Sequence, residues 1–296
     1  MIFAEDDAAY ETLSQKDLPR ATLVRTSYEE ETLTLGGNST EDRNRTGLVY
    51  GTEVYKKLVT TRPTRLLSVF CSIPLEDEAN YANQRIVYAD VDSVWKKDPL
   101  PLVNEYLQYG KNVVESTTQS EDNGLDIVAQ VDNPSLDPVA YCTGFLAMRQ
   151  NINVLHLLTE WETDLQKKWE AQEVENAGDQ PVFNSVIHNS PYLTGLIHAG
   201  LPSDVFPPGN VYFDNENTSK EDRERAVVVH NNWIVGHHNK KVRFYIWELW
   251  LLEGGDEWWA SEEAGITRDE RIMKTLVRSK GLLPEFVTNT LEFLSG

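Results

Sequence analysis

The chain has 296 residues, of which 40% are hydrophobic and 25% charged, the composition of an ordinary globular protein with ample length for a large core. Its 47 acidic and 27 basic side chains give a formal net charge of −20 at pH 7. Such a charge repels nucleic acids and anionic membrane surfaces, so we expect neither as a partner.

No apolar run in the sequence reaches the length of a membrane span, and no signal peptide is visible. We therefore expect membrane attachment only through an anchor that this sequence does not contain. The two cysteines, Cys71 and Cys142, show no Cys/His metal spacing. A single disulfide and two buried thiols both remain open for them.

Short apolar segments alternate with helical patterns along the chain. The expected strands are residues 2–4, 86–89, 126–132, 142–148 and 226–230. The expected helices are residues 6–15, 55–71 with an interruption near Pro63, 102–109, 154–169, 179–188 and two near the C-terminus, the first capped by Thr267 and Glu270. This alternation predicts an α/β protein with a mainly parallel, twisted sheet flanked by helices.

The expected strand at residues 86–89 ends in two aspartates, Asp90 and Asp92. Because residues i and i+2 of an extended chain point the same way, the two carboxylates share a side. They make half of a site for Mg²⁺ or Mn²⁺, of the kind that holds a diphosphate. Most acidic pairs in such an acidic chain are solvated, but this pair lies between apolar flanks, with Val94 and Trp95 following it. The pattern is typical of an enzyme that uses a nucleotide-sugar.

A second strand end carries His230, a potential imidazole ligand for the same cation. Gly236 allows backbone to approach a ligand closely, and Lys240 supplies a compact positive charge suited to phosphate. The alternative is a core histidine capped by Asn231. In an α/β sheet, ligands bind outside the carboxyl ends of strands, which favours the metal-binding interpretation when the aspartate pair is also considered.

Two further polar pairs have both a structural and a functional interpretation. Asp179 opens a helix, either as a simple N-terminal cap or, with Gln180, as a partner for sugar hydroxyls. Gln130 and Asp132, at the end of a strand, leave the same alternatives open. Two more candidates, which offer backbone access to a ligand beside a strand, are Thr143 and Gly144.

In this order, the motifs resemble the nucleotide-diphospho-sugar transferase family, which includes plant cell-wall xylosyltransferases and extensin arabinosyltransferases. The motifs are Tyr-Ala-Asp-Val-Asp-Ser-Val-Trp with Asp-Pro-Leu-Pro, Asp-Ile-Val-Ala-Gln-Val-Asp, Thr-Gly-Phe, Asp-Gln, and His-Asn-Asn-Trp-Ile-x-Gly-x-x-x-Lys-x-x-Arg-Phe. The resemblance covers roughly residues 1–251. It implies a GT-A-like domain over residues 1–254, with residues 255–296 as a helical extension packed on it.

The resemblance also implies dependence on Mn²⁺ (or Mg²⁺), retention of anomeric configuration and residence in the Golgi lumen. By position, its metal ligands are Asp90, Asp92 and His230. Its diphosphate-binding residues are Gly236 and Lys240. The residues beside its donor sugar are Asp179 and Gln180, with Gln130 and Asp132 close by. Family members usually begin with a further strand and loop that hold the nucleobase, and we expect this N-terminal strand to be missing here.

We therefore expect a metal-dependent, retaining glycosyltransferase that moves a sugar from a UDP-sugar to a glycan or glycoprotein acceptor. In that reaction Lys240 would neutralise the leaving diphosphate, and Asp179 or Gln180 would stabilise the oxocarbenium-like sugar. The missing strand keeps a second interpretation open, a catalytically inactive protein that binds a nucleotide-sugar or glycan. A third, an NDP-sugar nucleotidyltransferase, ranks last because Gly36 and Gly37 have no basic neighbour close by.

Overall fold

The computed structural model describes residues 2–4, 11, 14–15, 23–25, 60–72, 84–110, 124–171, 178–234 and 237–249. The chain divides into two compact units, residues 1–48 and residues 49–296. In the first unit, β1 (Ile2–Ala4) pairs in parallel with β2 (Leu23–Arg25), which confirms the strand expected at residues 2–4. The C-terminal helices expected within residues 255–296, and most of the helix expected at residues 6–15, lie outside the described residues.

The second unit contains a four-stranded sheet with the order β3-β6-β5-β7. Its strands are β3 (Arg85–Ala89), β5 (Ile127–Asn133), β6 (Ala140–Arg149) and β7 (His198–Leu201). The α/β class is confirmed, but the sheet is mixed: β5 and β7 pair in parallel, whereas β6 is antiparallel to both β3 and β5. The expectation of a mainly parallel sheet is corrected here because only residues 134–139 join β5 to β6, too few for the crossover that a parallel pair needs.

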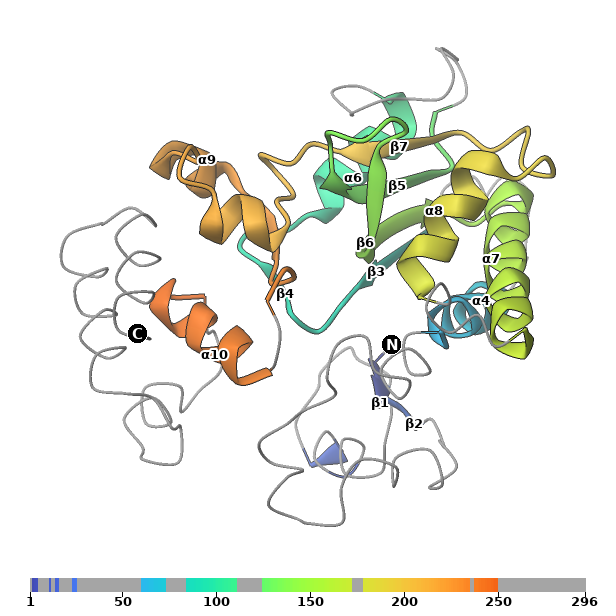
Figure 1. Ribbon diagram of the computed structural model, residues 1–296, viewed down its shortest axis with the longest axis horizontal. Coiled ribbons are helices and arrows are strands. Elements are labelled where there is room, and N and C mark those ends of the chain that lie inside the picture. The colour runs from blue at the N-terminus through green and yellow to red at the C-terminus, as the bar shows by residue number, and fades with distance from the viewer. Residues whose placement is uncertain are drawn as a thin grey trace. The chain divides into compact units, whose positions relative to one another are not determined.

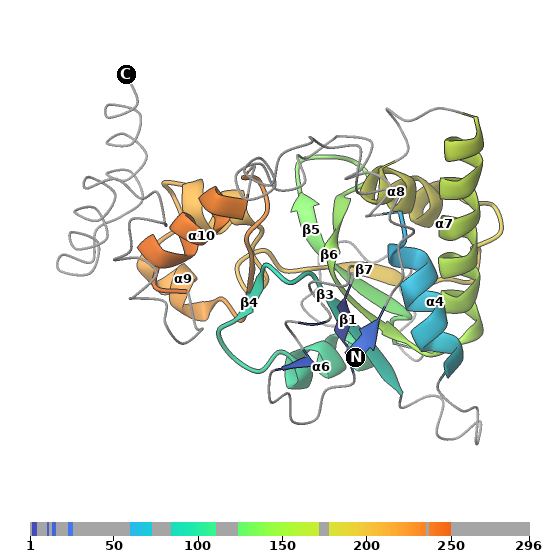
Figure 2. The same ribbon diagram turned by 90° about the horizontal axis from the view of Figure 1, so that it is seen from below.

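Helices cover both faces of this sheet (Figures 1 and 2). One face packs against α4 (Arg62–Ser72), α7 (Ile152–Glu170) and α8 (Asp179–Asn189). The other face packs against α6 (Leu100–Tyr109). Alternate residues of each central strand enter opposite cores: Ile127 and Leu146 face the three-helix layer, while Val128 and Phe145 face α6.

The helices form where the apolar spacing predicts them. On α7, the residues at steps of four, three and four from Val154 to Leu165 are buried, and Asn151 caps the helix by accepting from the amide of Val154 at 3.0 Å. Pro63, expected to interrupt a helix, instead lies in the first turn of α4, where a residue without an N–H costs no hydrogen bond. No helix among the described residues combines the length and apolar character that a bilayer crossing requires.

The second unit also contains a small two-stranded sheet, which follows Asp92 and ends at His230. In it β4 (Ser93–Trp95) pairs antiparallel with β8 (Val228–His230), and Ser93 lies opposite His230. The remaining elements are a π-helical turn (Asn210–Asp214), α9 (Lys220–Arg225) and α10 (His237–Ile246). The two cysteines do not pair: Cys71 is free and exposed, and Cys142 is free and buried.

The buried His198 on β7 predicts loss of stability in acid. Burial, with a smaller effect of His188, lowers the pKa of His198 from 6.5 to about 4. Between these values the unfolded chain binds a proton that the folded chain does not, so the free energy of unfolding falls as the pH drops, by at most about 1.4 kcal/mol per pH unit.

Urea denaturation at pH 7 and pH 5 should therefore show a loss of stability that is about 1–2 kcal/mol smaller in His198→Gln than in the unsubstituted chain. Equal losses in the two proteins would show that the fold does not hold His198 neutral.

Candidate metal and donor site

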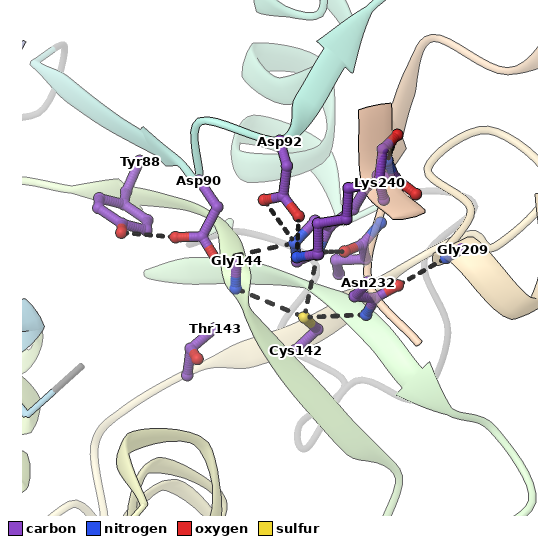
Figure 3. Close-up of polar contacts among 12 residues, drawn as sticks. Tyr88, Asp90, Asp92, Cys142, Thr143, Gly144, Gly209, Asn232 and Lys240 are labelled. Carbon is purple, nitrogen blue, oxygen red and sulfur yellow. Dashed lines mark hydrogen bonds and ion pairs between the residues drawn. The ribbon is translucent and has the colours of Figure 1, made fainter. Parts of the chain in front are cut away.

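The fold brings the two aspartates and the histidine of the sequence motifs together. Figure 3 shows Asp90 and Asp92 near each other after β3, with Lys240 close to Asp92. One ligand atom from each of Asp90, Asp92 and His230 lies within 4.8 Å of the others. The imidazole Nε2 of His230 is 3.4 Å from Oδ1 of Asp92 and 3.7 Å from Oδ2 of Asp90. Two backbone hydrogen bonds fix the segment between the aspartates: Asp90 N donates to Gly144 O at 2.8 Å, and Asn231 N donates to Asp92 O at 3.0 Å.

The orientation of the His230 ring is set by its other nitrogen. Nδ1 lies 3.1 Å from Oε1 of Gln130, and the amide nitrogen of Gln130 donates to Phe206 O at 3.0 Å. Because the amide nitrogen of Gln130 is engaged by a carbonyl, its oxygen faces Nδ1 and accepts a hydrogen bond from the N–H at that position. The Sγ atom of Cys142 lies 3.4 Å from the same nitrogen. This arrangement leaves Nε2 turned towards the two carboxylates.

Gly144 on β6 makes room for this ring. A β-carbon at position 144 would lie 2.1 Å from Cε1 of His230, a distance that real Cβ contacts do not reach. Only glycine lets the imidazole pass so close to the backbone of β6. In this structure the group that lies against the backbone of Gly144 is a side chain of the protein itself.

Cations balance the charge of the acidic cluster. Burial alone would raise the pKa of Asp92, but His230 and Lys240 outweigh it and hold that pKa well below its usual range. Burial would likewise lower the pKa of His230, but Cys142 and Asp92 raise it above its usual value. The ammonium of Lys240, on α10, forms an ion pair with Asp92. The cluster thus holds Asp92 ionised, as a carboxylate ligand of a divalent cation must be.

Arg62, the first residue of α4, joins the acidic cluster to α8. Its guanidinium donates to both oxygens of Asp90, at 2.8 and 3.1 Å, and forms an ion pair with Asp179. It also donates to the hydroxyls of Thr143 and Tyr88, and Tyr88 in turn donates to Asp90 at 2.7 Å. Burial opposes the charge on Arg62, but Asp179 and Asp90 outweigh it and keep its pKa above the usual value.

Asp179 and Gln180 are oriented by partners inside the site rather than by the helix end. The cap of α8 is Gly178, without a side-chain bond, and Asp179 accepts from the Thr143 hydroxyl at 2.9 Å. Burial raises the pKa of Asp179, although Arg62 and Thr143 oppose the shift. The amide of Gln180 donates to Asp132 at 3.1 Å.

The structure thus places most of the predicted site residues in one connected network. The network contains Asp90, Asp92, Gln130, Asp132, Thr143, Gly144, Asp179, Gln180, His230 and Lys240. Gly236 lies outside the described residues. Gln130 is fully buried, and both ends of its amide are bonded, the oxygen to His230 and the nitrogen to Phe206.

Sequence reasoning missed several residues of this network, among them Arg62 and Trp233. Arg62 is 28 residues from Asp90 and 117 from Asp179, so no local pattern joins them. Trp233 stands inside a quoted motif, but its indole bond to Asp132 spans 101 residues. Only the folded chain shows either contact.

Residues 1–244 match the family model described as nucleotide-diphospho-sugar transferase. The chain belongs to the nucleotide-diphospho-sugar transferase family. One relative is the UDP-D-xylose:L-fucose alpha-1,3-D-xylosyltransferase 3 of Arabidopsis thaliana, 29% identical over 69% of this chain and 50% of the relative. Another is the UDP-galactose:fucoside alpha-3-galactosyltransferase of Dictyostelium discoideum, 21% identical over 85% of this chain and 38% of the relative.

Among solved structures, mouse xyloside xylosyltransferase 1 aligns with a TM-score of 0.38 and 15% identity, over 77% of this transferase-family chain and 82% of the mouse chain. The galactosyltransferase LgtC aligns with a TM-score of 0.38 and 14% identity, over 85% and 87% of the two chains. This chain spans about half the length of the curated Arabidopsis relatives that it matches.

The contact between Gly144 and His230 predicts that Gly144→Ala destabilises the protein. The added methyl group would push the imidazole away, and such overpacking costs about 1–3 kcal/mol. The matched control is Gly195→Ala, whose Cβ would make an ordinary contact 3.6 Å from Asn153. Chemical denaturation should show the loss for Gly144→Ala only; equal stability of the two variants would contradict the packing described here.

Proposed function

We propose that this chain is a metal-dependent glycosyltransferase that moves a sugar from a UDP-sugar to a glycan or glycoprotein acceptor, with retention of anomeric configuration. The observation that carries the proposal is the cluster of Asp90, Asp92 and His230 in a chain of this family. The names of its plant relatives specify UDP-D-xylose and L-fucose, which supports a UDP-pentose as donor and a fucosylated glycan as acceptor. A location in the Golgi lumen, which the family resemblance implies, is part of the same proposal.

The residues of the cluster fit a hard divalent cation. Two carboxylates and one imidazole suit Mn²⁺ or Mg²⁺, whose remaining ligands would be oxygen atoms of water or phosphate. The imidazole already carries the support that metal-binding histidines use, a bond from its second nitrogen, here to Gln130. Asp90, Asp92 and His230 would hold the cation, which when bound supplies positive charge to a leaving diphosphate.

Lys240 is the positively charged side chain that lies beside Asp92. Its ammonium pairs with Asp92, and its side chain keeps 33% of its exposure, so a phosphate oxygen can reach it. A point charge next to the aspartates stabilises negative charge on the departing diphosphate. Gly236, four residues earlier in the sequence, is expected to bring backbone against the same group.

Asp179 and Gln180 are proposed to bind the donor sugar and to stabilise its developing positive charge. Arg62 is a positioning residue, because it holds Asp179 and Asp90 at fixed places on either side of its guanidinium. The acceptor hydroxyl then attacks the anomeric carbon from the face of the leaving group. The bond to the acceptor oxygen forms as the bond to the phosphate oxygen breaks, and that phosphate oxygen takes the hydroxyl proton, so no side-chain base is needed.

Calorimetry with UDP tests the proposal directly. We expect UDP to bind in Mn²⁺ and not in EDTA, because the diphosphate has few other charges to balance it in a chain of net charge −20. Asp92→Asn should abolish turnover and weaken Mn²⁺-dependent UDP binding about 100-fold, since it removes a charged ligand. Turnover in EDTA, or normal activity of Asp92→Asn, would overturn the proposal.

The role proposed for Gln130 predicts a selective loss of metal affinity. Gln130→Leu removes the acceptor for His230 Nδ1, and the loss of such a supporting bond weakens metal binding about 10–100-fold. A suitable control is Gln150→Leu, which changes another buried glutamine whose amide donates to a carbonyl, that of Phe70. Electron paramagnetic resonance titration with Mn²⁺ measures both affinities; equal values would remove Gln130 from the site.

A further inference from the structure

Trp233 combines exposure with a backbone conformation that large residues avoid. Its φ of 59° lies in the left-handed region, where a bulky residue is an outlier. It nevertheless leaves 56% of its surface exposed, so burial of the ring does not account for the strain. A strained conformation persists only where its surroundings fix it, and such positions are common at ligand-binding sites.

The chain leading into Trp233 is fixed by contacts of Asn232. The side-chain oxygen of Asn232 accepts from the amide of Gly209 at 2.6 Å, and its backbone oxygen accepts from Arg243 at 3.1 Å. A β-carbon at Gly209 would lie 2.2 Å from that backbone oxygen, so the two segments pack without space for a side chain. These contacts therefore fix the position of the backbone that leads into Trp233.

The indole itself is held by Asp132. Its Nε1 donates to Oδ1 of Asp132 at 3.0 Å, while Oδ2 of the same carboxylate accepts from Gln180 at 3.1 Å. One carboxylate thus joins the exposed aromatic ring to the residue proposed to face the donor sugar. With the N–H bound, the ring is a fixed flat surface beside polar groups, the combination that ligand sites use.

We propose that the exposed face of Trp233 is the platform on which an uncharged pyranose ring of the acceptor stacks. This inference rests on the proposed function and names the acceptor side of that site. The apolar C–H face of a pyranose lies against the indole, and the carboxamide of Gln180 and the carboxylate of Asp132 are in reach of its hydroxyls. The net charge of −20 and the adjacent carboxylate disfavour an anionic sugar.

Stacking by the uracil of the donor is the alternative use of such a ring. The connections of Trp233 argue against it, because Asp132 links the indole to Gln180 and Gln180 follows Asp179. The metal cluster, where the diphosphate is expected, is joined to Asp179 through Arg62, which pairs with Asp90 through one guanidinium nitrogen and with Asp179 through another. A nucleobase extends from the diphosphate in the direction away from the donor sugar, whereas an acceptor lies against that sugar.

The test uses the full chain with Mn²⁺ and UDP, and the methyl α- and β-glycosides of L-fucopyranose as probes, with affinities measured by ligand-observed NMR. Trp233→Gly removes the platform and fits the positive φ, so the fold has no added strain. We expect about a tenfold loss of glycoside affinity in this variant, the size of one aromatic stacking contact, and unchanged affinity for UDP with Mn²⁺.

Trp233→Phe keeps a stacking face and should retain most of the glycoside affinity. The control is Tyr192→Gly, which removes another exposed aromatic side chain, 80% exposed, and should leave both affinities unchanged.

Equal glycoside affinity of Trp233→Gly and the unsubstituted chain would overturn the inference, as would failure of the unsubstituted chain to bind either glycoside. A parallel loss of UDP affinity in Trp233→Gly would assign the ring to the nucleobase and would also overturn it. Failure of the unsubstituted chain to bind UDP with Mn²⁺ would contradict the proposed function. This result is distinguishable from the others because UDP binding and glycoside binding are measured separately.

Discussion

The site depends on the balance of charge around Asp90, Asp92 and Asp179. Removing several carboxylates from water is costly unless cations lie beside them, and removing one partner leaves an uncompensated charge. In this chain Arg62 lies between Asp90 and Asp179, and Lys240 lies beside Asp92. Helices α4, α8 and α10 must therefore lie near the end of β3, because they carry the charged side chains that pair there.

The hydrophobic cores supply the rigidity that this requirement needs. Strands β5 and β6 send alternate residues into two separate cores, so a shift of one residue in either strand would move each set into the opposite core, whose packing it does not fit. The pairing of β4 with β8 adds the register that places His230 opposite Ser93, one residue after Asp92. A divalent cation site tolerates little displacement of its ligands, and the sheet register provides that precision.

Much of this arrangement could be predicted from the sequence because it is encoded locally. The apolar spacing of residues 154–165 predicts α7, and the aspartates that follow an apolar strand predict where its polar end lies. The relative directions of neighbouring strands could not be predicted in the same way, since an alternation of strands and helices does not indicate which strands pair. The short link between β5 and β6 was the signal for antiparallel pairing, and the sequence-based expectation of a mainly parallel sheet did not use it.

The parts of the site that the sequence did not reveal depend on contacts between distant residues. Arg62 resembles any arginine at a helix start until the fold places it between two carboxylates, and Trp233 resembles a core residue of a strand-end motif until its exposure and positive φ are known. Gln130, expected beside the donor, is fully buried and bonded to His230, a role that no spacing of residue types distinguishes from ligand contact.

The central claim is that Asp90, Asp92 and His230 hold a cation that binds the donor diphosphate. The most direct measurement is anomalous diffraction at the manganese absorption edge from crystals grown with Mn²⁺ and UDP. We predict one strong anomalous peak within coordinating distance of all three side chains, with the diphosphate oxygens of UDP on its open side. UDP bound with no such peak, or a peak away from these residues, would contradict the claim.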